Sequence, residues 1–141
     1  MKKIRPSLTL ALLEAREATM TYFRPALNER GLTEQQWRII RILYQHEELE
    51  SNQLANLACI LKPSLTGILN RMMDLNLIKK NKDPHDQRIN LITLTEEGKS
   101  CFEAQAVKME ASYKQIQEQY GAEKMQQLLD LLKDLAKIKI N

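Results

Sequence analysis

Residues 62–94 read KPSLTGILNRMMDLNLIKKNKDPHDQRINLITL, and the hydrophobic period of this stretch changes halfway along its length. The first part repeats apolar residues every three or four positions, which predicts an amphipathic helix with Pro63 in its first turn. Residues 77–81 and 89–94 instead have the composition of strands, and a polar turn separates them. The sequence therefore predicts a helix followed directly by a β-hairpin.

The net charge of the chain is concentrated in the same stretch. Residues 62–88 hold six basic and three acidic side chains, so their net charge of +3 equals the formal charge of the whole chain. A basic segment on an otherwise neutral body is typical of a surface that binds nucleic acid. A solvated charged hairpin would be the simpler interpretation if the charge stood alone.

Three helices are predicted before this stretch. Apolar side chains repeat at helical spacing over residues 7–30, and Gly31 should end this helix. Pro25 lies inside it and should kink or split it. Thr33-Glu34-Gln35-Gln36 forms a capping box that opens a second helix. Ser51 is expected to cap a short third helix, with Leu54, Leu57 and Ala58 facing inward.

Two helices are predicted after the hairpin. A long one should begin at Thr95-Glu96-Glu97 and end near Gln119, because Gly121 breaks the pattern before a last helix at about 122–138. The predicted fold class is therefore mainly α with a small β-hairpin wing, in a single domain of residues 1–141. A winged helix-turn-helix lobe would span residues 33–94, between flanking helices in residues 1–32 and 95–141.

The order of these elements predicts DNA binding. In a helix-turn-helix the second helix enters the major groove, and the hairpin that follows can reach the neighbouring minor groove. Asn70 could read adenine, Arg71 could contact guanine or a phosphate, and Arg88 suits a narrow minor groove if Asp83 and Asp86 orient it. The full set of candidate DNA-binding residues is Ser51, Lys62, Pro63, Ser64, Thr66, Asn70, Arg71, Asp83, Asp86 and Arg88.

The hairpin turn Asp83-Pro84-His85-Asp86-Gln87-Arg88 resembles the D-x-x-D-x-R wing of the MarR family of regulators, and Leu94-Thr95-Glu96-Glu97-Gly98 resembles the junction that follows it. The resemblance covers nearly the whole chain. It implies dimerisation helices at both ends and a homodimeric repressor that binds a palindromic operator on double-stranded DNA. The two isolated cysteines make a reducing cytoplasm the expected setting.

Three further stretches, within residues 7–25, 32–38 and 58–69, are similar to members of the family that control aromatic catabolism. That similarity implies release from DNA by a small phenolic or phenylacetate-type acid, such as 4-hydroxyphenylacetate or homoprotocatechuate. Other aromatic acids, such as a hydroxycinnamate or salicylate, and a drug or stress response stay open as alternatives.

Four residues are candidates for binding such an acid: Arg16, Trp37, Arg38 and Arg41. Arg16 has Leu12 and Leu13 as helical neighbours, so we expect it to be partly buried, in a salt bridge or as a clamp for a carboxylate. Trp37, Arg41 and Tyr44 share a helical face, which is either core or the wall of an effector pocket. Aromatic side chains on such a face most often belong to the core, and the family resemblance adds support for the pocket.

Other classes of function have little support in the sequence. No nucleophile has an adjacent base and no glycine-rich loop could hold a phosphate, so we do not expect this chain to be an enzyme. Cys59 and Cys101 are isolated, as are both histidines, so we predict no metal site and no cofactor, with Cys59 buried as a packing residue. No apolar run approaches the length of a membrane span. A helical module that binds only proteins would not need the basic hairpin.

Overall fold

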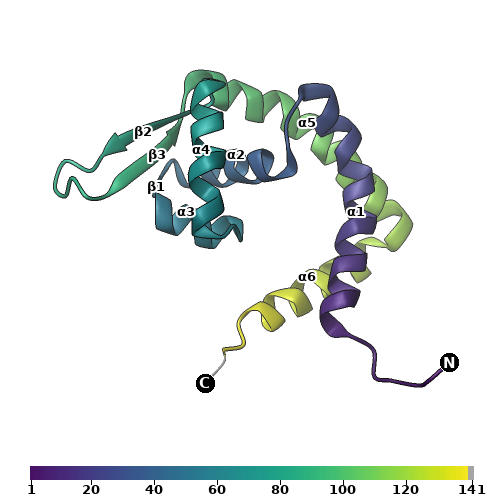
Figure 1. The fold of residues 1–141 in the computed structure, drawn as a ribbon. Helices are drawn as coiled ribbons and strands as arrows, with labels where there is room; N and C mark the ends of the chain where they lie inside the picture. Colours follow the sequence, from purple (N-terminus) through teal and green to yellow (C-terminus); the bar gives the residue numbers. More distant parts are fainter. Residues whose placement is uncertain (140–141) are drawn as a thin grey trace. The chain divides into compact units, whose positions relative to one another are not determined.

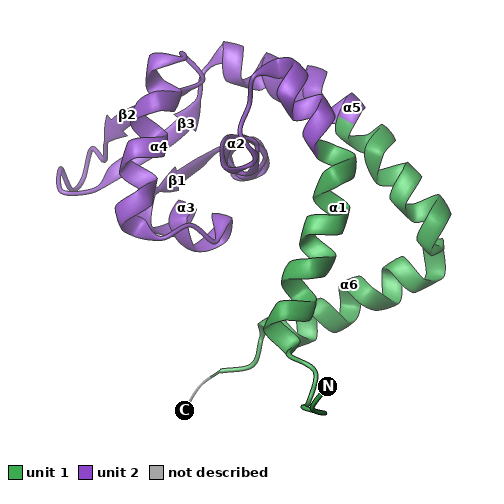
Figure 2. Ribbon diagram, turned by 45° about the vertical axis from the view of Figure 1, so that its right-hand side comes forward, with its two compact units in different colours: residues 1–23, 109–141 green, residues 24–108 purple. Residues whose placement is uncertain are grey.

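The computed structural model describes residues 1–139, and these residues form six helices and one three-stranded sheet (Figure 1). The chain divides into two compact units, one of residues 24–108 and the other of residues 1–23 with 109–141 (Figure 2). The predicted fold class, mainly helical with a small β wing, is confirmed.

The unit of residues 24–108 contains α2 (Glu34–His46), α3 (Ser51–Ala58) and α4 (Lys62–Asp74), together with the sheet. The sheet is antiparallel in the order β1 (Glu48–Glu50), β3 (Asn90–Leu94) and β2 (Ile78–Lys82). Strands β2 and β3 form the predicted hairpin, which extends away from the helices of this unit (Figure 1).

The core of this unit lies between the three helices and the central strand. Its most completely buried side chains include Ile39, Ile40, Leu43, Leu54, Met72 and Ile92. The capping box at Thr33 is present as predicted, because the Thr33 hydroxyl accepts from the Gln36 amide at 3.0 Å and the Gln36 side chain accepts from the Thr33 amide at 3.1 Å. It fixes the start of α2, which carries the apolar stripe of the core.

The other unit contains the first part of α1 (Leu8–Arg30), the last part of α5 (Glu96–Tyr120) and α6 (Ala122–Ala136). Met20 and Met125 are its buried apolar residues, and the Tyr22 hydroxyl lies 2.7 Å from Oε1 of Gln119. Many of its apolar side chains are exposed in the single chain, among them Leu8, Leu10, Leu13, Leu131 and Ile138. Many exposed apolar side chains in one unit are typical of an interaction surface.

Several local expectations need correction. Helix α1 continues through Pro25, so of the two expected effects, a kink or a split, the split is wrong; the buried side chains of Met20 and Leu27 lie on either side of the proline. Ser51 is the first helical residue rather than the cap. The cap is Glu50, whose amide donates to the Gln53 side chain at 3.1 Å.

The end of α3 also differs from the sequence prediction. Cys59 is exposed rather than buried, because it ends the helix in the left-handed conformation with φ at 55°. Leu57 is exposed, and Ala55 takes the inward position that we expected for it beside Leu54 and Ala58. The inward positions of Leu54 and Ala58 are confirmed, and only the prediction for Leu57 is wrong.

Candidate nucleic-acid interface

Helix α4 is anchored by one face and exposed on the other. Leu65, Leu69 and Met72 are buried in the core, which turns the opposite side of the helix toward solvent. The candidate DNA-binding residues of α4 are all exposed: Lys62, Pro63, Ser64, Thr66, Asn70 and Arg71. Within residues 1–139 the side chains of Asn70 and Arg71 make no hydrogen bond, so their polar groups remain available to a ligand. Ser51, by contrast, is half-buried at the start of α3.

The wing carries a guanidinium held in one orientation. Nε and Nη2 of Arg88 each lie 3.0 Å from an oxygen of Asp86, and the Arg88 amide donates to the same carboxylate at 3.0 Å. The Arg88 side chain is nevertheless 89% exposed. Hydrogen bonds from Arg88 lower the pKa of the Asp86 carboxyl below its ordinary value, and Asp86 raises the pKa of Arg88. Asp86 therefore orients an accessible charge, as predicted.

Asp83 has a different task from the one predicted. Its carboxylate accepts from the His85 amide at 2.8 Å, and its own amide donates to the Ile89 carbonyl at 3.0 Å. These bonds shape the turn. The expectation that Asp83 also orients Arg88 is wrong, because its acceptor oxygen is directed to the backbone instead.

The junction after the wing fixes β3 and α5 against the connection between α4 and β2. The Thr95 hydroxyl donates to the Asn76 carbonyl at 2.7 Å and accepts from the Gly98 amide at 2.9 Å. The Thr95 amide donates to the Leu77 carbonyl at 3.0 Å. This small network ties the base of the wing to the end of α4, so both candidate DNA-binding elements are anchored at the same junction.

An aromatic cluster joins α2 to α5. The rings of Trp37 and Phe102 are stacked with centroids 5.3 Å apart, and those of Tyr44 and Phe102 are stacked at 4.1 Å. Trp37 is buried, whereas Tyr44 and Arg41 are exposed on the same helix. No sequence pattern indicated Phe102, since it comes from α5 and is far along the chain from α2.

Arg38 is occupied by contacts within the protein. Its guanidinium forms an ion pair with Glu34 one turn earlier on α2, and it also donates to the carbonyls of Ala58 and Cys59. The side chain therefore supplies a partner for carbonyls at the end of α3, which would otherwise have none within the helix. These contacts favour a structural role for Arg38 over binding of a ligand.

Replacement of Arg38 by methionine should lower the free energy of unfolding by about 2 kcal/mol, because it leaves the α3 carbonyls and Glu34 without their charged donor. The measurement is urea unfolding. Arg41→Met is the matched control on the same helix, and it should change stability by less than about 0.5 kcal/mol because Arg41 is exposed. Equal effects of the two substitutions would contradict this assignment.

Arg16 lies on α1 in the other unit and is exposed in the single chain. The expectation that it is partly buried is therefore wrong for one chain, because its helical neighbours Leu12 and Leu13 are themselves exposed. Its proposed role as a carboxylate clamp does not depend on burial within one chain.

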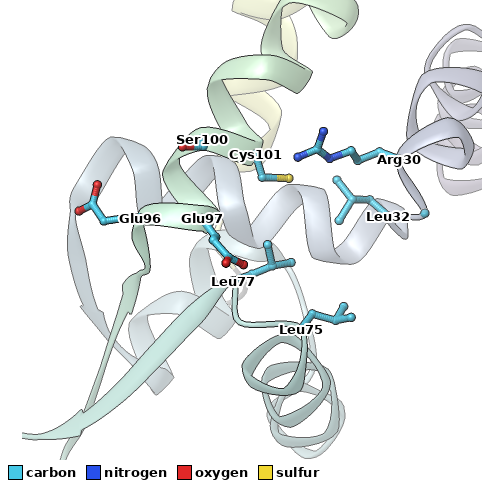
Figure 3. Close-up of a pocket in the computed structure, with 9 residues that line it drawn as sticks. Arg30, Leu32, Leu75, Leu77, Glu96, Glu97, Ser100 and Cys101 are labelled. Atoms are coloured by element: carbon cyan, nitrogen blue, oxygen red, sulfur yellow. The ribbon is translucent and has the colours of Figure 1, made fainter.

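A shallow cavity of about 500 Å³ lies elsewhere in the unit of residues 24–108 (Figure 3). Leu32, Leu75 and Leu77 give it an apolar lining, and Arg30 and Glu97 add charges. None of the four predicted effector residues lines it.

Within residues 1–139 no cluster of His, Cys, Asp and Glu side chains is arranged to hold a metal ion. In the same residues, no helix has both the length and the apolar character needed to cross a membrane.

Comparison with known proteins agrees with this geometry. The MarR family model matches residues 32–89. The chain is 51% identical over 128 residues to the homoprotocatechuate degradative operon repressor of Escherichia coli. The matched region covers 91% of this chain and 86% of the relative. That relative is a repressor rather than an enzyme, in agreement with the expectation for this chain.

Two solved structures are similar over nearly the full length. The transcriptional regulator PA4135 has a TM-score of 0.93 and 57% identity, and the match covers 96% of this chain and 100% of that one. NadR in complex with 4-hydroxyphenylacetate has a TM-score of 0.86 and 45% identity, with 99% of each chain covered. From its winged helix, its wing motif and these similarities, the chain belongs to the MarR family.

Proposed function

We propose that this chain is a transcriptional repressor that binds a palindromic operator through α4 and the wing. The observation that carries the proposal is the pairing of Arg88 with Asp86, which holds an exposed guanidinium at the tip of a hairpin beside an exposed polar helix. The ten candidate DNA-binding residues named from the sequence are proposed as its contacts, with Ser51 at the edge of the surface.

The repressor would act as a homodimer. The exposed leucines of the unit formed by residues 1–23 and 109–141 supply an apolar surface that a second copy would cover. Ile4, Leu8 and Leu12 are proposed to pack against Leu128, Leu132 and Leu135 of the other subunit. In a two-fold dimer the two copies of α4, the proposed recognition helices, would lie about 34 Å apart, which is one turn of DNA. The two-fold symmetry of the dimer would require a palindromic operator.

The proposed effector is a phenolic acid of the 4-hydroxyphenylacetate type. Two similarities support it: the E. coli relative is a homoprotocatechuate operon repressor, and NadR has been crystallised with 4-hydroxyphenylacetate. In this chain, Tyr44 is the exposed ring of the stack that it forms with Phe102 and the buried Trp37, and Arg41 is an exposed cation on the same helix as Tyr44. Arg16 is the second proposed partner for the carboxylate. The proposed setting is the cytoplasm.

The test measures binding of the full-length chain to an operator isolated by selection from random DNA duplexes, with and without 4-hydroxyphenylacetate or homoprotocatechuate. One of these acids should weaken operator binding about 10-fold or more, because an effector shifts the equilibrium by its preference for the form that cannot bind DNA. The matched control is 4-hydroxyphenylethanol, which lacks the carboxylate and should have no effect. Arg41→Met should bind the operator normally and lose the response.

The outcomes separate the parts of the proposal. Failure to enrich any duplex, or binding that ignores salt concentration, would contradict DNA binding itself, since neutralised phosphates must make affinity fall as salt rises. Operator binding that neither acid weakens would contradict only the effector. Salicylate and a hydroxycinnamate, tested in the same assay, would then identify another aromatic acid as the ligand.

A further inference from the structure

The centre of the exposed face of α4 carries no side chain. Gly67 is in the interior of this helix and is exposed, and the residues one turn before and after it on the same face are Pro63, Ser64, Asn70 and Arg71. All four are exposed as well. A Cβ atom placed on Gly67 would meet no atom within 4 Å outside the helix's own turn.

Neither the backbone nor packing explains this glycine. Gly31 and Gly121 have positive φ angles, and Gly98 lies against the Leu77 carbonyl, so those three positions have local reasons for glycine. Gly67 has helical backbone and open space around it. Glycine in the middle of a helix is less favourable than alanine by up to about 1 kcal/mol. The reason for Gly67 must therefore come from something that approaches this face from outside.

We infer that Gly67 is the point at which the recognition helix comes closest to the bases, and that a thymine methyl group occupies the space where a side chain would be. This inference rests on the proposed DNA-binding function. A helix that lies in the major groove by this face presents bare backbone at its centre, which allows a closer approach to base edges.

Thymine fits this position better than the other bases. Its C5-methyl is the apolar group that unmodified base pairs expose in the major groove, and apolar protein surface is what recognises it. The glycine Cα is apolar, and the Pro63 ring lies one turn before it on the same face. Ser64 and Asn70, on either side, have the hydrogen-bonding groups for polar base edges. Gly67 is thus assigned a role in specificity rather than in general affinity.

The first experiment compares Gly67→Ala with the unchanged chain. Gly67→Ala should raise Tm by roughly 2–5 °C, because it improves helix propensity without a clash. It should also weaken operator binding about 10-fold or more, while binding to a scrambled duplex stays within about 2-fold. Ser100→Ala, at an exposed position of α5, is the control and should leave operator affinity unchanged.

The second experiment replaces each thymine of the selected operator by deoxyuridine, which removes only the methyl group. Replacement at one symmetrical pair of positions should lower the affinity of the unchanged chain by about 4-fold per half-site. This is the effect expected when one methyl-sized group is no longer buried. Gly67→Ala should show a clearly smaller loss at the same positions, because its own methyl group already excludes the contact.

The results distinguish this inference from the proposed function. If the unchanged chain selects an operator but Gly67→Ala binds it equally well, the inference is wrong and the function stands. If no deoxyuridine position couples to Gly67, the assignment of thymine is wrong. If the unchanged chain selects no operator at all, the proposed function fails first.

Discussion

Replacement of Gly98 by alanine should lower the free energy of unfolding by about 3 kcal/mol. A Cβ on Gly98 would lie 2.1 Å from the Leu77 carbonyl oxygen and 3.1 Å from Cδ2 of Leu94. The nearest atom belongs to the backbone, so relief requires a shift of the main chain rather than rotation of a side chain. Urea unfolding of the full chain measures the change.

The same substitution should weaken operator binding, because the displaced carbonyl is part of the junction that supports the wing. The Leu77 carbonyl accepts the Thr95 amide, and the Thr95 hydroxyl bonds both Asn76 and Gly98. A shift there loosens the base of the wing relative to the end of α4.

Gly67→Ala is the matched control for stability, since the same change on the exposed face of α4 should be stabilising. Opposite signs for the two glycines are therefore the expected result. Unchanged stability of Gly98→Ala would contradict the close approach of α5 to Leu77.

The elements that the sequence predicted well are those whose signals are local. The stripe of Leu65, Leu69 and Met72 repeats at helical spacing, so both the helix and its exposed face followed from it. Strand β1 was missed because three residues with one apolar side chain have no recognisable period. Leu49 pairs with Ile92, more than forty positions away, and only the folded chain brings them together.

The same distinction applies to the candidate site. The pairing of Asp86 with Arg88 spans two residues, and the wing motif predicted it. The contacts of Arg38 with carbonyls at the end of α3 and the stacking of Phe102 on Trp37 join distant segments, and no pattern in the sequence indicates them. The prediction that Arg38 binds an effector rested on its place on α2 and on the family resemblance, neither of which indicates its contacts with α3.

Replacement of Arg88 by alanine should weaken operator binding by roughly 100-fold. A guanidinium that contacts DNA in a fixed geometry is worth about 1–3 kcal/mol, and the proposed dimer uses two wings. The pair with Asp86 holds the guanidinium before DNA is bound, so little side-chain freedom is lost on binding. Fluorescence anisotropy with the selected operator measures the affinity, and the unfolding free energy should be unchanged because Arg88 is exposed.

Asp86→Asn separates orientation from charge. Removing a negative charge near DNA should strengthen binding if the wing acts only by electrostatic attraction. If Asp86 orients Arg88, the substitution should instead weaken operator binding, by several-fold but less than Arg88→Ala, because an amide holds the guanidinium less firmly than a carboxylate. Tighter binding of Asp86→Asn would contradict the orienting role.

The dependence on pH gives an independent test of the same pair. Because Arg88 lowers the pKa of Asp86, the pair is fully formed above the ordinary carboxyl pKa of 3.8 and is lost only as the pH falls through the lowered value. Operator affinity should therefore show no transition assignable to this pair between about pH 5 and pH 8.

Arg88→Ala should also reduce the slope of log affinity against log salt by about 2 for the dimer, one for each wing. An unchanged slope would mean that Arg88 faces solvent in the complex, and the wing would then have no part in holding DNA.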